Sequence, residues 1–189
     1  SKGGSWYWLD PESGRMATGW EKASDGKWYY FEGSGAMRSG GWMKQGSSWY
    51  YLSGSGAMQT GWLSKGGSWY WLDPESGRMA TGWEKASDGK WYYFEGSGAM
   101  QSSRWLKQGT AWYYLSGSGA MQTGWLLTGG AWYWMDPESG MMATGWLENG
   151  GSWYYLDPSS GAMATGTAVI DGTRYIFDDS GACADFVDE

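Results

Sequence analysis

Residues 47–62 read SSWYYLSGSGAMQTGW, and this short stretch decides how the chain folds. Trp49 to Leu52 is a run of residues that favour strands, and Ser53 to Gly56 contains the small, flexible residues of a turn. The segment 57–60 is expected to return as a second strand, which predicts a β-hairpin. A Gly-Trp pair at 61–62 then leads through a polar loop into the next hairpin.

The same unit recurs along the whole chain. Trp-Tyr-Tyr or Trp-Tyr-Trp triplets begin every 20 to 22 residues, at Trp6, Trp28, Trp49, Trp69, Trp91, Trp112, Trp132 and Trp153. Residues 1–37 reappear letter for letter as residues 64–100, so three units form a block of 63 residues. A period of this kind is typical of an array in which each unit packs mainly on its neighbours. A lone hairpin is marginal in water, so each one is expected to need the next.

The composition narrows the classes of function. The chain has 18 Trp, 14 Tyr and 11 Met against 4 Phe, so many rings are expected at a working surface rather than in a core. A formal net charge of −7 and the lack of a basic run disfavour a nucleic-acid ligand. There is no His and only one Cys, Cys183, which excludes His-based catalysis, His metal sites and an internal disulfide. No apolar run is long enough for a transmembrane helix.

The acidic residues do not point to an enzyme either. They recur at the turns of the repeats, as solvated turn residues do, whereas catalytic pairs need unique environments that separate their pKa values. We therefore expect no catalytic residue, metal site or cofactor in this chain. The turn acids are Asp10, Glu12, Asp73, Glu75, Asp136, Glu138 and Asp157.

Alternation along the strands predicts where the rings meet. Trp28 and Tyr30 point to one face of their hairpin and Tyr29 points to the other. If hairpins stack in one direction, the Trp face of one meets the middle-Tyr face of the next. Each junction would gather a Gly-Trp tryptophan, the first Trp of the following triplet and the middle Tyr of the hairpin after that, with a Met as its floor. The expected sets are Trp20, Trp28, Tyr50 and Met37; Trp42, Trp49, Tyr70 and Met58; Trp62, Trp69, Tyr92 and Met79; Trp83, Trp91, Tyr113 and Met100; Trp105, Trp112, Tyr133 and Met121; Trp125, Trp132, Tyr154 and Met142; and Trp146, Trp153, Tyr175 and Met163.

Three electron-rich rings around a gap form a cage for a cation, above all for a quaternary ammonium, which has no hydrogen bonds to satisfy. Choline is the natural guest. Each ring contributes roughly 0.5 to 2 kcal/mol, so one cage is weak, but a row of cages gains on a polymeric ligand. The alternative is that the rings only fill the interface between repeats. The two interpretations are compatible, because Trp8, Trp71 and Trp134, at the third triplet position, are candidates for pure packing.

The units at 41–62 (GWMKQGSSWYYLSGSGAMQTGW) and 145–166 (GWLENGGSWYYLDPSSGAMATG) closely resemble the choline-binding repeats of Gram-positive surface proteins, autolysins and phage lysins. The resemblance implies an all-β, left-handed β-solenoid of stacked hairpins, about three per superhelical turn. It also implies cages of two Trp from one hairpin and a Tyr from the next, with a Met nearby. Such modules bind choline or phosphocholine on teichoic or lipoteichoic acids, hold a separate domain non-covalently on the cell wall, and in several cases form homodimers.

Several positions depart from the repeated pattern. Arg104 precedes Trp105 where the earlier copy has Gly41. A guanidinium close to that cage would repel a cation, and the alternative is that Arg104 points to solvent. The lost Gly also predicts an altered backbone at this junction. In the last unit Thr167 and Arg174 replace the two tryptophans and Cys183 stands at the Met position. We therefore expect residues 1–166 to form the repeat array, with about eight hairpins and an incomplete first one, and residues 167–189 to form a cap. Cys183 is expected to be a buried apolar residue.

One rival function stays open on the sequence. Short aromatic and Gly-rich repeats of glucan-binding enzymes and clostridial toxins resemble these units, and aromatic faces also stack on sugars. Those repeats tend to carry Phe and Ile where this chain has Trp and Met, and residues 175–177 (Tyr-Ile-Phe) are the most similar to them. The chain also begins inside a repeat, which suggests a piece of a longer secreted protein.

Overall fold

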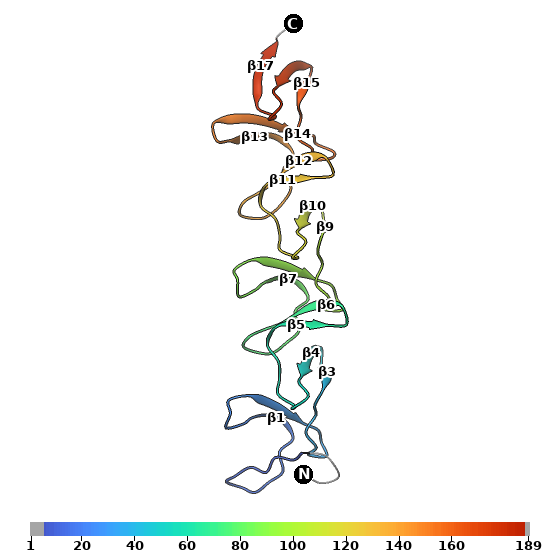
Figure 1. The fold of residues 1–189 in the computed structure, drawn as a ribbon, viewed down its shortest axis with the longest axis vertical. Coiled ribbons are helices and arrows are strands. Elements are labelled where there is room, and N and C mark those ends of the chain that lie inside the picture. Colours follow the sequence, from blue (N-terminus) through green and yellow to red (C-terminus); the bar gives the residue numbers. More distant parts are fainter. Residues whose placement is uncertain (1–5, 188–189) are drawn as a thin grey trace. The chain divides into compact units, whose positions relative to one another are not determined.

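The computed structural model describes residues 6–187 and shows an all-β chain of consecutive hairpins (Figure 1). The chain divides into two compact units, residues 1–100 and 101–189. The first unit contains β1 (Gly19–Lys22), β2 (Trp28–Phe31), β3 (Gly41–Gln45), β4 (Ser48–Leu52), β5 (Gly61–Lys65), β6 (Ser68–Leu72), β7 (Gly82–Lys85) and β8 (Trp91–Phe94). The second contains β9 (Arg104–Gln108), β10 (Ala111–Leu115), β11 (Gly124–Thr128), β12 (Ala131–Met135), β13 (Gly145–Asn149), β14 (Ser152–Leu156), β15 (Gly166–Ile170), β16 (Thr173–Phe177) and β17 (Cys183–Val187).

The hairpins are all-β as predicted, but they pair different segments from those expected. The Gly-Trp segment is itself the first strand, and it pairs antiparallel with the triplet strand that follows it, as β3 does with β4. The Met segment at 57–60, expected as the second strand, makes only a single bridge from Met58 to Leu52. The Gly-containing connection between β3 and β4 is therefore the tight hairpin turn, in which Gly46 has φ of 60°.

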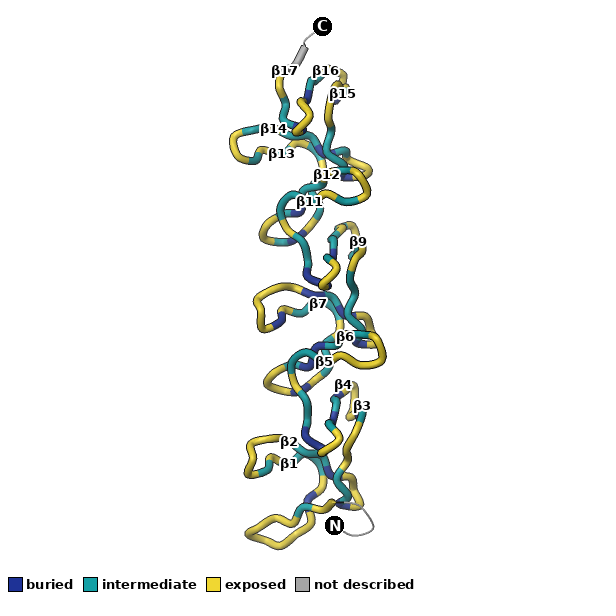
Figure 2. The backbone as a smooth tube through the Cα atoms, viewed as in Figure 1, coloured by how far each residue is buried: buried dark blue, intermediate teal, exposed yellow. Residues whose placement is uncertain are grey.

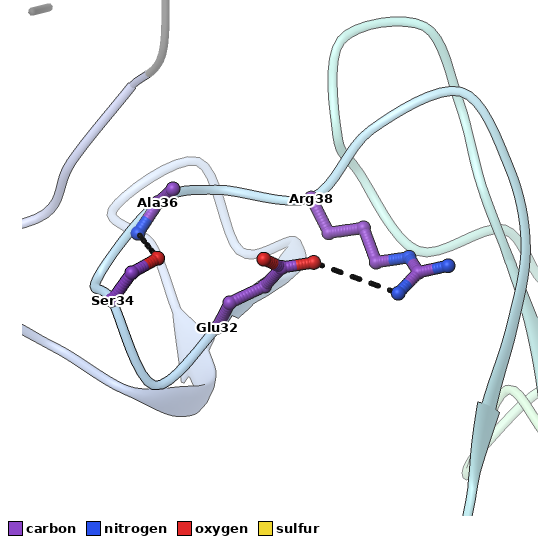
Figure 3. Close-up of polar contacts among 4 residues, drawn as sticks. All are labelled: Glu32, Ser34, Ala36 and Arg38. Atoms are coloured by element: carbon purple, nitrogen blue, oxygen red, sulfur yellow. Dashed lines mark hydrogen bonds and ion pairs between the residues drawn. The ribbon is translucent and has the colours of Figure 1, made fainter.

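The segment after each triplet strand is a turn, and in several copies a side chain of the turn accepts hydrogen bonds from its own backbone. In the Asp-Pro copies the carboxylate accepts local hydrogen bonds, as Asp73 does from the Ser76 amide at 2.7 Å. In the Glu-Gly-Ser-Gly copy the Ser34 hydroxyl accepts from the Ala36 amide at 3.4 Å (Figure 3). The same figure shows Arg38 paired with Glu32 at 3.6 Å, an exposed ion pair worth under about 1 kcal/mol.

Within each of the two units, backbone hydrogen bonds link successive repeats. The amide of the Met after a turn donates to the carbonyl of the first triplet Trp in the preceding repeat, as Met58 does to Trp28 at 2.8 Å. The Met segment is therefore engaged between hairpins, which explains why it does not extend the ladder of its own hairpin. Within each unit successive hairpins point in different directions, as β3–β4, β5–β6 and β7–β8 show (Figure 1).

The core is thin and runs along the inner ends of the triplet strands. One apolar residue closes each of these strands and is at most 4% exposed, while the hairpin tips face solvent (Figure 2). These residues are Phe31, Leu52, Leu72, Phe94, Leu115, Met135, Leu156 and Phe177. Because so little apolar area is fully enclosed, the half-buried rings between hairpins must supply much of the packing.

The last hairpin differs from the others. β15 and β16 are followed by β17, which pairs with β16 where other repeats have only the single Met bridge. Cys183 lies opposite Phe177, at the register position of the methionines, and is half-buried rather than buried as expected.

The lost glycine at the start of β9 leaves a strained residue. Ser103 has φ of 54°, and its amide donates to the Ser116 carbonyl as that of Gly40, with φ of 68°, does to Ser53. A left-handed conformation costs a non-glycine residue about 1 kcal/mol or more. We therefore expect Ser103→Gly to stabilise the chain by about 1 kcal/mol, measured by thermal unfolding. Ser118→Gly, at a residue without positive φ, is the control, and an equal gain there would contradict the explanation.

Candidate functional site

Two tryptophans of one hairpin form the first two walls of each candidate site. Trp62 on β5 and Trp69 on β6 project from the same face, with ring centroids 6.2 Å apart and planes at 87°. Trp125 and Trp132 repeat this geometry at 6.4 Å and 90°. The first triplet tryptophans are unusually open for such large rings; Trp132 is 42% exposed. Two perpendicular indole faces are thus presented to one gap.

The middle Tyr of the next hairpin supplies the third wall. In the first unit Trp20, Trp42 and Trp62 lie 5.0, 4.9 and 4.8 Å from the rings of Tyr50, Tyr70 and Tyr92. In the second unit Trp105, Trp125 and Trp146 lie 4.9, 4.8 and 4.8 Å from Tyr133, Tyr154 and Tyr175. The structure therefore brings the Gly-Trp and middle-Tyr rings together in six of the seven expected sets, and it places the first triplet Trp beside them in five: Trp28, Trp69, Trp112, Trp132 and Trp153. The fourth set, Trp83, Trp91 and Tyr113, draws on both units and stays a prediction.

The third triplet ring supports the Gly-Trp tryptophan from behind. Trp71 pairs across the hairpin with Trp62 at 5.1 Å and is only 2% exposed, and Trp134 supports Trp125 at the same distance. These two rings pack as expected. Trp8, expected to pack in the same way, instead lines a cavity of about 350 Å³ with Trp6, Tyr29, Met37 and Ser55. That cavity is the incomplete first junction.

Cavities occupy the gaps between the rings. One of about 260 Å³ is lined by Trp20, Trp28, Tyr50 and Met58. Another, of about 290 Å³, is lined by Trp105, Trp112, Tyr133 and Met142. Each cavity is lined by two tryptophan rings from one hairpin and by a tyrosine ring and a methionine thioether from the next repeat.

The methionines were assigned to these junctions one repeat too early. Met58, expected beside Trp42, lines the Trp20 cavity, and Met142, expected beside Trp125, lines the Trp105 cavity. The reason is the hydrogen bond between repeats, which ties each Met to the triplet Trp before it. The observed pairs are Met37 with Trp6, Met58 with Trp28, Met79 with Trp49, Met100 with Trp69, Met142 with Trp112 and Met163 with Trp132.

The turn of a third hairpin completes each cavity, which sequence reasoning missed. Glu75, Ser76 and Arg78 line the Trp20 cavity, and Ser159 and Ser160 line the Trp105 cavity. The turn can approach because its closing residue is Gly: a Cβ on Gly161 would lie 2.4 Å from the Met142 sulfur. The recurrence of this Gly at the same place in each repeat was the one sequence signal that the turn forms a fourth wall of the cavity.

Arg104 does not enter the cavity beside it. On β9 it lies on the opposite face from Trp105, because neighbouring residues of a strand alternate. Its guanidinium donates to the Gln101 side chain and is exposed, and it is not among the residues that line the Trp105 cavity. The Arg104 guanidinium therefore does not repel a cation from inside this cavity. The replacement of the Gly-Gly pair of the earlier copy by Ser103 and Arg104 instead strains the backbone at Ser103.

Charged groups near the junctions lie both on strands and in turns. On β9 the Lys107 ammonium lies 5.3 Å from the Trp112 ring centroid, and on β3 that of Lys44 lies 5.8 Å from the Trp49 centroid. Hydrogen bonds from the Ser159 and Ser160 hydroxyls lower the pKa of the Asp157 carboxyl to about 2. Burial and a 2.8 Å hydrogen bond to Asp88 raise the pKa of the Tyr92 hydroxyl to about 12. Within residues 6–187 no cluster of metal-ligating side chains occurs, and no helix could cross a membrane. The arrangement can hold a ligand through π faces and a soft sulfur.

The chain matches one family of repeats along most of its length. The choline-binding repeat family matches residues 2–42, 39–82, 75–105, 106–144 and 138–167. The structure of CbpJ from Streptococcus pneumoniae is similar at a TM-score of 0.77 and 36% identity, covering 95% of this chain and 70% of that one. The structure of choline binding protein F from the same species is similar at a TM-score of 0.77 and 40% identity, and the match covers 90% of this chain and 58% of that one.

A separated binding domain gives a third comparison. The choline-binding domain of CbpL from Streptococcus pneumoniae matches at a TM-score of 0.61 and 32% identity, covering 89% of this chain and 87% of that one. The comparison with curated proteins gave no match. The chain therefore belongs to the choline-binding repeat family, and its aromatic clusters lie between hairpins as that family's repeats require.

Proposed function

We propose that each complete junction holds one choline headgroup. The observation that carries the proposal is the repeated enclosure of one gap by two perpendicular indoles, a tyrosine ring and a methionine sulfur. A trimethylammonium group is a cation without hydrogen-bond donors, so it needs π faces and polarisable walls rather than polar partners. No buried polar side chain lies unpaired among residues 6–187, which suits a guest of this kind.

The number of junctions suits a polymeric ligand. A single cage of three rings, at roughly 0.5 to 2 kcal/mol per ring, gives affinities on the order of millimolar. A second phosphocholine on the same polymer binds at a high effective concentration, so affinity rises with the number of engaged cages. Teichoic and lipoteichoic acids that carry phosphocholine are therefore the proposed partners.

The role we assign to the module is non-covalent attachment of a secreted protein to the bacterial cell-wall surface. Within it, the hairpins are proposed to wind as a left-handed solenoid with about three hairpins per turn, which fits the 63-residue block. Residues 1–166 would form the binding array and residues 167–189 its cap, where β17 supplies the extra strand. The module itself is non-catalytic, and two copies are proposed to form a homodimer.

Titration with choline tests this function. Two of the three rings of each cage are indoles, so occupancy is expected to change tryptophan fluorescence with half-saturation in the millimolar range. The same titration with dextran and galactose oligosaccharides tests the carbohydrate alternative. A response to sugar with none to choline up to tens of millimolar would overturn the proposal.

A further inference from the structure

The cages are not chemically equal, because one tyrosine donates its hydroxyl to a carboxylate. Tyr92, the third wall of the Trp62 and Trp69 cage, donates to Asp88 Oδ2 at 2.8 Å. Asp88 lies in the loop that joins β7 to β8, and its other oxygen accepts from the Lys90 amide at 3.1 Å. The carboxylate is thus fixed at the rear edge of a ring whose face contacts Trp62 at 4.8 Å.

The chain contains a matched cage without this contact. It is formed by Trp125, Trp132 and Tyr154, which are equivalent to Trp62, Trp69 and Tyr92 in the next three-repeat block. The two Trp ring centroids are 6.4 Å apart here and 6.2 Å apart in the first cage, and the Trp–Tyr distance is 4.8 Å in both. The loop before Tyr154 reads Glu-Asn-Gly-Gly in place of the Ala-Ser-Asp-Gly-Lys before Tyr92. Among residues 6–187 the Tyr154 hydroxyl has no hydrogen-bond partner. The two cages also differ at the residue opposite the first triplet Trp, which is Ser64 for Trp69 and Leu127 for Trp132, so the effect of the charge is tested by substituting Asp88 itself.

A phenol that donates to an anion carries more electron density on its ring. Attraction of a cation to a ring face is electrostatic, so added density on the ring strengthens it. The carboxylate is itself a negative charge next to the cage, in an exposed loop where salt screens it, so the hydrogen bond through Tyr92 is its main route to the ring. Both effects act on a cation and neither acts on a neutral guest of the same shape.

We propose that Asp88 acts through Tyr92 to make the Trp62, Trp69 and Tyr92 cage the tighter of these two cation sites. Asp88 is a positioning and polarising residue that does not touch the ligand. The inference rests on the proposed function and adds a rank order to it.

The test compares a cation with its neutral isostere at two sites in one sample. Indole N–H resonances of Trp69 and Trp132 report each cage separately, with choline and 3,3-dimethyl-1-butanol as ligands. In the parent chain choline is expected to bind about threefold more tightly at Trp69 than at Trp132, with the alcohol equal at both. Asp88→Asn keeps an acceptor for Tyr92 and removes the charge, so it should erase the choline difference and leave the alcohol unchanged.

Two further variants sharpen the outcome. Replacing residues 147–152 with the sequence of residues 84–90 should tighten choline binding at Trp132, while Asp25→Asn, in the identical loop of β1–β2, should leave Trp69 unchanged. Equal choline constants in the parent and the Asp88→Asn chain, or an equal loss for both ligands, would overturn the inference. If neither indole responds to choline, both the proposed function and the rank order are wrong. If both indoles respond with equal choline constants, only the rank order is wrong.

Discussion

Trp132→Ala is expected to weaken choline binding at its junction by about tenfold while leaving the fold intact. Trp132 is 42% exposed and forms one of the two indole walls, so its removal opens the cage more than it uncovers the core. A cation–π contact with a desolvated guest is worth about 1 to 2 kcal/mol, which sets the tenfold figure. The measurement is the choline constant reported by the Trp125 indole resonance, together with the melting temperature.

The control is Val169→Ala, at a side chain that is 70% exposed on β15 and lines no described cavity. It should change neither the constant nor the melting temperature. An unchanged choline constant at Trp125 in the Trp132→Ala chain would mean that the indole face is not a wall of the binding site.

Gly161→Ala is expected to cost about 2 to 3 kcal/mol of stability and to weaken choline binding in the Trp105 cavity. The residue has φ of 75°, and an added Cβ would lie 2.4 Å from the sulfur and 2.5 Å from the methyl carbon of Met142. The Met must therefore move, and with it one wall of the cavity that also holds Trp112 and Tyr133. Urea unfolding measures the first effect and choline titration the second.

Gly166→Ala separates the two causes of that loss. Gly166 also has positive φ, at 70°, but a Cβ there would meet no atom within 4 Å. It should therefore show only the backbone cost of about 1 kcal/mol and normal choline binding. Equal destabilisation by the two substitutions would show that the close approach of Met142 to the turn has no energetic weight.

The ring clusters could be predicted from the sequence because they depend only on alternation and repetition. Once Trp28 and Tyr29 lie on opposite faces of one strand, stacking in a constant direction brings Trp20 to Tyr50, and the structure has them 5.0 Å apart. The same reasoning holds for the five later junctions that lie within a unit, because the spacing hardly varies. Local rules were sufficient wherever the contact joined neighbouring strands.

Features that depend on hydrogen bonds between repeats could not be predicted in this way. The segment around Met58 looked like the partner of the triplet strand, yet its amide bonds to Trp28 in the preceding hairpin. That bond removed the expected second strand and shifted the methionines by one junction. The third hairpin's turn was missed for a similar reason, since nothing in Ser159 itself indicates which cavity it will reach. Of the two orientations considered for Arg104, the alternation of side chains along β9 selects the one that faces away from Trp105.

The most direct test of the account is a crystal structure of the chain grown with choline. The account predicts the trimethylammonium group of choline in the gap enclosed by Trp105, Trp112, Tyr133 and Met142, with the hydroxyl end toward the turn at Ser159. Equivalent density should appear at the junction of Trp20, Trp28, Tyr50 and Met58. Choline bound at the hairpin tips or on single strands, with these gaps empty at saturating ligand, would contradict the claim that binding lies between the hairpins.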